Sequence, residues 1–224
     1  MTAHDALVQH EQNLWSVEGM VPAAPFRRRM CIARRSDGSL VFFHAIPLEE
    51  KVLAQVKALG KPAHLVVGSH HHAIDAHAFA ERLGLQIFGP KRAEAGLRER
   101  CDLAGALEDL PSDPAVSVES LPGSKLGEAV MVVRSGERQS VLFCDAIQNN
   151  PPEKLNFMFR LLGFGGGPRT PPIFRMFFLQ DKAAMRAAFE RLAGLPGLRR
   201  IVPCHGDMVE GGAADALRAA AAAL

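Results

Sequence analysis

Three apolar stretches of this chain each run into a side chain that can bind a metal ion or carry acid–base chemistry. The first precedes His70–His72, the second precedes Asp145, and the third precedes His205. The three stretches are residues 65–67, 141–144 and 201–204. In α/β proteins, ligands bind in the crevice at the carboxyl ends of the strands. We therefore expect three buried strands whose polar ends meet on one rim of a sheet.

The order of the other segments predicts an α/β fold with two mixed β-sheets flanked by helices. Asp37-Gly38 between two apolar runs is typical of a hairpin, and Gly60 and Gly84 end predicted helices. The further predicted strands are 14–17, 30–34, 40–44, 86–88, 116–118 and 130–133. The predicted helices are 47–59, 76–83, a charged helix from 90 to about 100, 181–192 and the alanine-rich 213–224. Residues 149–172 are expected to form a long loop.

Length and charge narrow the classes of protein. A chain of 224 residues favours a single domain, 1–224. A formal net charge of +2 is too small to indicate a nucleic-acid surface, and no run approaches the ~20 apolar residues of a membrane span. Four cysteines without metal-motif spacing indicate buried thiols and a cytoplasmic protein. We expect a small-molecule substrate and no membrane partner.

The densest cluster of potential ligands is His70–His72, followed by Asp75 and His77. In an extended segment alternate residues share a face, so His70 and His72 would reach one ion while His71 points away. Asp75 could coordinate the ion or cap the following helix. Imidazole and carboxylate ligands suit zinc, and also iron or manganese. The alternative is an exposed histidine-rich turn, with Asp145 capping a turn and His205 packed in the core.

This order of features resembles the metallo-β-lactamase superfamily, and especially its divergent, uncharacterised β-lactamase-like branch. The matching features are a hairpin after residues 14–17, the histidine cluster, Asp145, and the run Pro203-Cys204-His205-Gly206-Asp207. The resemblance implies an αββα sandwich with one or two zinc or iron ions at the sheet rim. It also implies that a bridging aspartate and a strand-end histidine of the family correspond to Asp145 and His205.

The chain departs from the family pattern His-x-His-x-Asp-His. Counted from His70, the aspartate comes one residue late as Asp75, and Ala76 follows it. His77 could replace the missing ligand. No histidine occurs between residues 78 and 204, where the family has one, and Glu128 is the substitute in that segment. We therefore expect a single-ion site of His70, His72 and His205, with Asp145 or Asp75 beside it.

The resulting hypothesis is a metal-dependent hydrolase that acts on a small ester, lactone, amide or phosphoester through a metal-activated water. Asp75 or Asp145 would orient that water or act as general base. The alternative is a non-catalytic or metal-free binding protein on the same fold. A redox di-iron protein is a third possibility, but it needs more ligands and a flavin partner domain. Six phenylalanines between residues 157 and 178 indicate packing under a loop, an apolar substrate lid or a homodimer contact.

Overall fold

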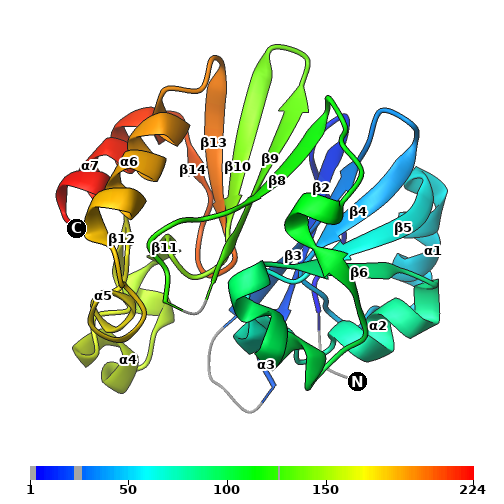
Figure 1. Cartoon of the computed structure of the whole chain (residues 1–224), viewed down its shortest axis with the longest axis horizontal. Helices are drawn as coiled ribbons and strands as arrows, with labels where there is room; N and C mark the ends of the chain where they lie inside the picture. Colours follow the sequence, from blue (N-terminus) through cyan, green and yellow to red (C-terminus); the bar gives the residue numbers. More distant parts are fainter. Residues whose placement is uncertain (1–3, 23–26, 126) are drawn as a thin grey trace.

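A computed structural model describes residues 4–22, 27–125 and 127–224. Two β-sheets pack face to face, with helices on both outer faces (Figure 1). This is the predicted arrangement of two mixed sheets flanked by helices. Within the described residues, no helix has the length and apolar character that a membrane span requires.

The first sheet follows the chain order from β1 to β7. Its strands are β1 (Val8–Glu11), β2 (Leu14–Met20), β3 (Arg27–Arg34), β4 (Ser39–Phe43), β5 (Lys61–Val66), β6 (Gln86–Gly89) and β7 (Leu103–Ala106). The first four strands pair antiparallel, and β4 to β7 pair parallel. The helices α1 (Glu50–Leu59) and α2 (Ala76–Leu83) pack on the outer face of this sheet. The 3-10 turn η2 (Lys91–Ala93) and the helix α3 (Glu94–Arg98) follow β6.

The second sheet has the order β14-β13-β10-β9-β8. Its strands are β8 (Val116–Ser120), β9 (Ala129–Ser135), β10 (Arg138–Phe143), β13 (Leu198–Pro203) and β14 (Val209–Glu210). The helices α6 (Lys182–Ala193) and α7 (Ala213–Ala222) cover its outer face (Figure 1). Strand β10 pairs parallel with β13, and Phe143 lies opposite Pro203. The residues that follow these two strands therefore emerge side by side.

The core between the sheets follows from the period-two pattern of the strands. In β4, Val41 and Phe43 face the second sheet, whereas Leu40 and Phe42 face the helices of the first. All four side chains are buried. Both faces of β4 are covered, so the strand is an unbroken apolar run rather than an alternating one. The site therefore rests on a rigid, fully packed support.

Several boundaries differ from the sequence predictions. The helix expected from residue 47 begins at Glu50, and β1, β7 and β14 were not predicted. Residues 149–172 are not a structureless loop: after β11 (Gln148–Asn150) they hold η4 (Pro152–Lys154), α4 (Phe157–Leu161), β12 (Gly166–Arg169) and the start of α5 (Pro172–Phe177). Each of these four elements is only three to six residues long, so no hydrophobic period develops in their sequence. A further turn, η3 (Leu107–Asp109), follows β7.

Candidate metal centre

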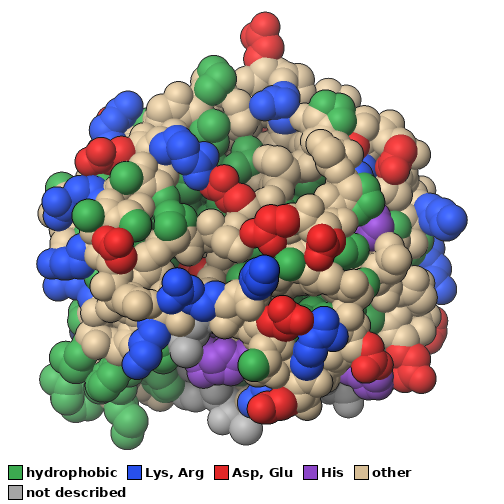
Figure 2. Space-filling model, viewed as in Figure 1, with side chains coloured by type: hydrophobic (Ala, Val, Ile, Leu, Met, Phe, Trp, Pro, Cys, Tyr) green, Lys and Arg blue, Asp and Glu red, His purple; other side chains and the backbone are tan. Residues whose placement is uncertain are grey.

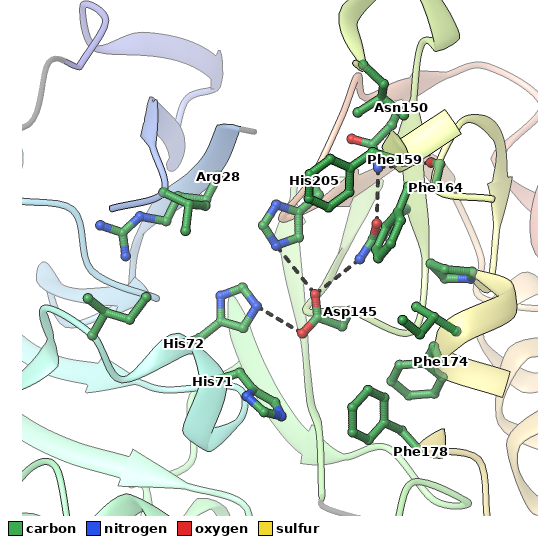
Figure 3. A pocket seen from close by; sticks show the side chains of 16 residues that line it. Arg28, His71, His72, Asp145, Asn150, Phe159, Phe164, Phe174, Phe178 and His205 are labelled. Atoms are coloured by element: carbon green, nitrogen blue, oxygen red, sulfur yellow. Dashed lines mark hydrogen bonds and ion pairs between the residues drawn. The ribbon is translucent and has the colours of Figure 1, made fainter. Parts of the chain in front are cut away.

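Three side chains converge at the rim where the two sheets meet. The Nε2 atom of His72 lies 3.1 Å from one carboxylate oxygen of Asp145, and the Nε2 atom of His205 lies 3.4 Å from the other (Figure 3). His72 lies in the turn η1 (His70–His72), which follows β5 of the first sheet, and the other two residues follow β10 and β13. These three predicted residues therefore lie together, as expected for side chains that follow neighbouring strand ends.

The histidine run is not extended. His70–His72 form a single 3-10 turn, η1, so alternate residues do not share a face. His72 is buried and points to Asp145, whereas His71 lines a cavity beside it. The ring of His70 stacks on that of His71 with centroids 3.9 Å apart. The prediction that His70 and His72 point the same way from an extended segment is wrong for this reason.

The other predicted ligands have partners of their own. The carboxylate of Asp75 forms an ion pair with the buried guanidinium of Arg28. The exposed ring of His77 lies 3.6 Å from the carboxylate of Asp102. Among the described residues, no group of donors close enough to share an ion includes His70, Asp75 or His77. Their roles as ligands stay predictions. Such groups do include His72 and His205 together with Cys204, and Asp145 together with Glu128 and Cys144.

Two buried cysteines and a third histidine lie around His72, an arrangement that was not predicted from the sequence. The Sγ atom of Cys204 lies 3.5 Å from Nδ1 of His72. The ring of His44 stacks on that of His72 at a centroid distance of 4.3 Å, and one donor atom each of His44, His72 and Cys144 falls within 4.8 Å of the others. The sequence did contain a signal for the two cysteines, because Cys144 directly precedes Asp145 and Cys204 directly precedes His205.

Gly68 makes room for this packing. A Cβ atom at Gly68 would lie 2.7 Å from Cε1 of His44 and 3.0 Å from Sγ of Cys144. His44 itself has a positive φ of 67°, a rare backbone conformation for a residue other than glycine. Neither of its ring nitrogens has a hydrogen-bond partner among the described residues. The packing around His44 therefore holds its backbone in this conformation, which the residue would not adopt by its own φ/ψ preference.

Glu128 has a structural role at the site. Its two carboxylate oxygens accept the backbone N–H groups of Asp145 and Ala146 at 2.8 and 2.9 Å. The Nε2 atom of Gln148 donates to Asp145 at 3.2 Å. Glu128 therefore holds the backbone of the segment after β10, and Gln148 holds the side chain of Asp145. The predicted role of Glu128 as a substitute ligand stays a prediction: both its oxygens accept backbone hydrogen bonds, and one also lies within 4.8 Å of donor atoms of Cys144 and Asp145.

The charges of the three convergent residues stabilise one another. Burial by itself lowers the pKa of His72, but Cys144, Cys204 and Asp145 more than reverse this and raise it well above its usual range. The pKa of His205 is raised in the same way, and that of Asp145 is held well below its usual range by His72 and His205 despite its burial. Burial raises the pKa of Cys204, but the two histidines outweigh it and lower the pKa to about 7. These shifts favour the charged forms of the three residues, with the carboxylate between two imidazolium groups.

A cavity of about 260 Å³ opens above these three residues. His72, Asp145 and His205 form its polar floor (Figure 3). The remaining wall is mostly apolar and comes largely from the segment between β11 and α6. The apolar lining residues are Val21, Ile74, Leu155, Phe159, Phe164, Pro171, Ile173, Phe174 and Phe178.

The donor set fits a divalent ion such as zinc. Nδ1 of His205 lies 2.7 Å from the carbonyl oxygen of Arg27, which can only accept, so Nδ1 carries the proton and Nε2 faces Asp145 with its lone pair when neutral. Two imidazole nitrogens and a carboxylate are ligands that zinc takes, and Cys204 adds a thiolate donor within 4.8 Å of both histidines. Iron and manganese accept the same nitrogen and oxygen donors.

The architecture of this chain is found in proteins of known structure. No protein-family model and no curated protein sequence matches the chain. Solved structures do match it over nearly its whole length. A metallo-β-lactamase from Hirschia baltica is 13% identical with a TM-score of 0.63, and 96% of each chain is covered. The DIM-1 metallo-β-lactamase is 10% identical with a TM-score of 0.69, covering 100% of this chain and 99% of the other.

A third match is the metallo-β-lactamase FIM-1 from Pseudomonas aeruginosa in its mono-zinc form. It is 12% identical with a TM-score of 0.63, and the match covers 97% of this chain and 95% of the other. Identities this low together with near-complete coverage mean that the backbone arrangement is shared while most side chains have changed. The chain therefore has the metallo-β-lactamase fold and is a divergent example of it.

Proposed function

We propose that the protein is a metal-dependent hydrolase that holds one zinc ion through His72, Asp145 and His205. The observation that carries this proposal is the convergence of two imidazole Nε2 atoms on one carboxylate at the floor of a cavity. Three protein ligands around zinc are typical of catalytic sites, because a fourth position stays open for water. The mono-zinc form of a protein with the same fold supports a single ion.

Bound zinc would lower the pKa of a water molecule toward neutrality and polarise the oxygen of a scissile carbonyl or phosphoryl group. Asp145 is the carboxylate at the cavity floor, so it would orient the water as well as coordinate. Gln148 restrains Asp145 through the 3.2 Å hydrogen bond, and Glu128 fixes the backbone behind it. Because Asp75 is paired with Arg28, we assign it to holding the site together rather than to general-base catalysis. The expected substrates are small esters, lactones, amides or phosphoesters.

The metal content of purified protein tests the proposal directly. After loading with zinc and gel filtration, the wild-type protein should retain about one equivalent by elemental analysis. His72→Ala and His205→Ala should each lose it, because each removes one of three ligands. His77→Ala is the matched control, since this histidine is exposed and lies outside the cluster, and it should retain the ion. Full retention of zinc in both His72→Ala and His205→Ala would refute the assigned ligands.

A metal-free binding protein on the same fold is the second candidate. The three donors already satisfy one another as ion pairs, and the cavity above them is largely apolar. A protein of this kind needs no ion to keep its site in place. The absence of bound metal after separate loading with zinc, iron and manganese would favour this function over the hydrolase.

A further inference from the structure

The cavity wall opposite the metal centre is formed largely by the segment between β11 and α6, which includes α5. In α5, Ile173 and Phe174 line the cavity, whereas Met176 and Phe177 are 73% and 58% exposed and do not line it. Figure 2 shows hydrophobic side chains gathered at the edge of the molecule that α4 and α5 occupy. The inner side chains therefore do not merely fill a core, because they face a space that is large enough for a ligand.

The apolar wall of the cavity carries no charged side chain among its described residues. Arg28 is the one lysine or arginine among the described lining residues. Its buried guanidinium is paired with Asp75, and its Nε atom has no hydrogen-bond partner among the described residues. The amide of Asn150 donates to Gln148 at 3.0 Å, so these polar side chains are also engaged. Phosphate and carboxylate groups are usually bound by arginine or lysine side chains with open donors. The apolar wall therefore suits an uncharged part of a ligand, such as an alkyl or aryl group.

The size of the cavity sets the size of that ligand. A buried apolar cavity of about 150 Å³ in another protein holds benzene, which has six non-hydrogen atoms. In proportion, the 260 Å³ cavity holds about ten such atoms. Four phenylalanine rings surround this space, and Phe174 and Phe178 stack with centroids 5.8 Å apart. An acyl chain of about eight carbons or an aryl group fits these dimensions.

We propose that the substrates are uncharged carboxylic acid derivatives, such as esters, whose medium-length alkyl or aryl acyl group lies against Ile173, Phe174 and Phe178. This inference rests on the proposed hydrolase function and selects one substrate class for it. Hydrolysis of such an ester adds the hydroxyl of water to the acyl carbon, breaks the acyl C–O bond and transfers the proton to the departing alcohol. With the chain on the apolar wall, the acyl carbon lies toward Asp145 at the floor.

A chain-length series of p-nitrophenyl esters tests the proposal with the zinc-loaded protein. From acetate to octanoate, kcat/KM should rise about fourfold for each added methylene, because each is transferred from water to an apolar wall. Beyond about ten carbons the rise should stop, since the cavity is filled. Bis(p-nitrophenyl) phosphate should be cleaved at least about a hundredfold more slowly than the octanoate ester.

Two pairs of variants on α5 isolate the inner wall. Ile173→Trp fills the cavity and Phe174→Ala removes contacts, and each should lower the preference for octanoate over acetate about tenfold. Met176→Trp and Phe177→Ala make the same changes at exposed positions of α5 that do not line the cavity, and they should leave that preference within about twofold. Phe174 is also a core residue, so if Phe174→Ala does not fold, Ile173→Trp carries the test.

Titration calorimetry of the metal-free protein with 1-octanol separates this proposal from the proposed function. Saturable binding that Ile173→Trp abolishes, without hydrolysis of any ester, would support the ligand class and refute the hydrolase. Ester hydrolysis that is independent of chain length and equal in inner and outer variants would overturn the ligand class alone. Preferential cleavage of the phosphodiester, or failure of octanol to bind, would overturn it as well.

Discussion

Replacing Asp145 by asparagine removes the charge that holds two histidines at the cavity floor while it keeps the shape of the side chain. The carboxylate forms a hydrogen bond with His72 at 3.1 Å and an ion pair with His205 at 3.4 Å. Hydrogen bonds to charged groups each contribute about 1.5–3 kcal/mol, and the longer contact and the partial exposure of Asp145 place the sum near the lower end. We expect Asp145→Asn to lower the free energy of unfolding of the metal-free protein by about 3 kcal/mol at pH 5.5. For a chain of this size that corresponds to a loss of about 6–12 °C in Tm.

The pH dependence of this difference follows from the directions of the pKa shifts. The pKa values of His72 and His205 are raised on folding, so their contribution is complete below about 6.5 and is lost as the pH rises through the folded values. The pKa of Asp145 is lowered on folding, so its contribution is complete above about 3.9 and is lost as the pH falls through the folded value. The difference between wild type and Asp145→Asn should therefore be largest between about pH 4 and 6.5 and should shrink under alkaline conditions.

Urea denaturation of metal-free protein at pH 5.5 and pH 9 measures both effects. Asp181→Asn is the matched control, because Asp181 caps α6 through the N–H of Ala184 and asparagine caps a helix about equally well. This control should change the free energy of unfolding by less than about 0.5 kcal/mol at either pH. A difference for Asp145→Asn that is below about 1 kcal/mol at pH 5.5, or equal at the two pH values, would refute the electrostatic reasoning.

Three further predictions concern the surroundings of the site. Glu128→Gln leaves one of the two backbone N–H groups poorly bonded. It should therefore lower the free energy of unfolding by about 1–2 kcal/mol in urea denaturation and weaken zinc binding about tenfold. If both quantities stayed unchanged, Glu128 would not support the backbone after β10. Gly68→Ala should lower the free energy of unfolding by about 1–3 kcal/mol, because its Cβ meets packed side chains. Gly194→Ala is the control, since its Cβ has no contact under 3.4 Å, and it should be nearly neutral in thermal unfolding. Equal effects of the two substitutions would count against this packing. Zinc affinity measured by calorimetry should rise from pH 6 to pH 8, because His72 and His205 must lose protons to bind the ion, and a flat profile would disagree.

The strand-end pattern was the most informative part of the sequence. Parallel pairing of β10 with β13 places Asp145 and His205 beside each other, and β5 brings His72 to the same rim. The predicted fold class is confirmed by the two packed sheets and by the solved structures with the same fold. These features could be read from the sequence because buried strands leave long apolar runs that end abruptly in polar residues.

Other parts of the site leave no comparable signal in the sequence. Three adjacent histidines have no hydrophobic period, so the turn at His70–His72 could not be distinguished from an extended segment. The partner of Asp75 is Arg28, which lies 47 positions earlier in the chain. Glu128 binds backbone groups whose direction depends on the fold of the segment after β10. Contacts of this kind depend on tertiary structure and become visible only when the sheets are assembled.

The division of the chain between the two sheets has a consequence for assembly. Residues 8–106 supply every strand of the first sheet, and residues 116–210 supply every strand of the second. Each half can form its own strand pairs from contacts within that half, but His72 meets Asp145 and His205 only when the halves dock. Occupation of the site by an ion would therefore report on docking, and two fragments divided near residue 112 should recombine more tightly when zinc is present.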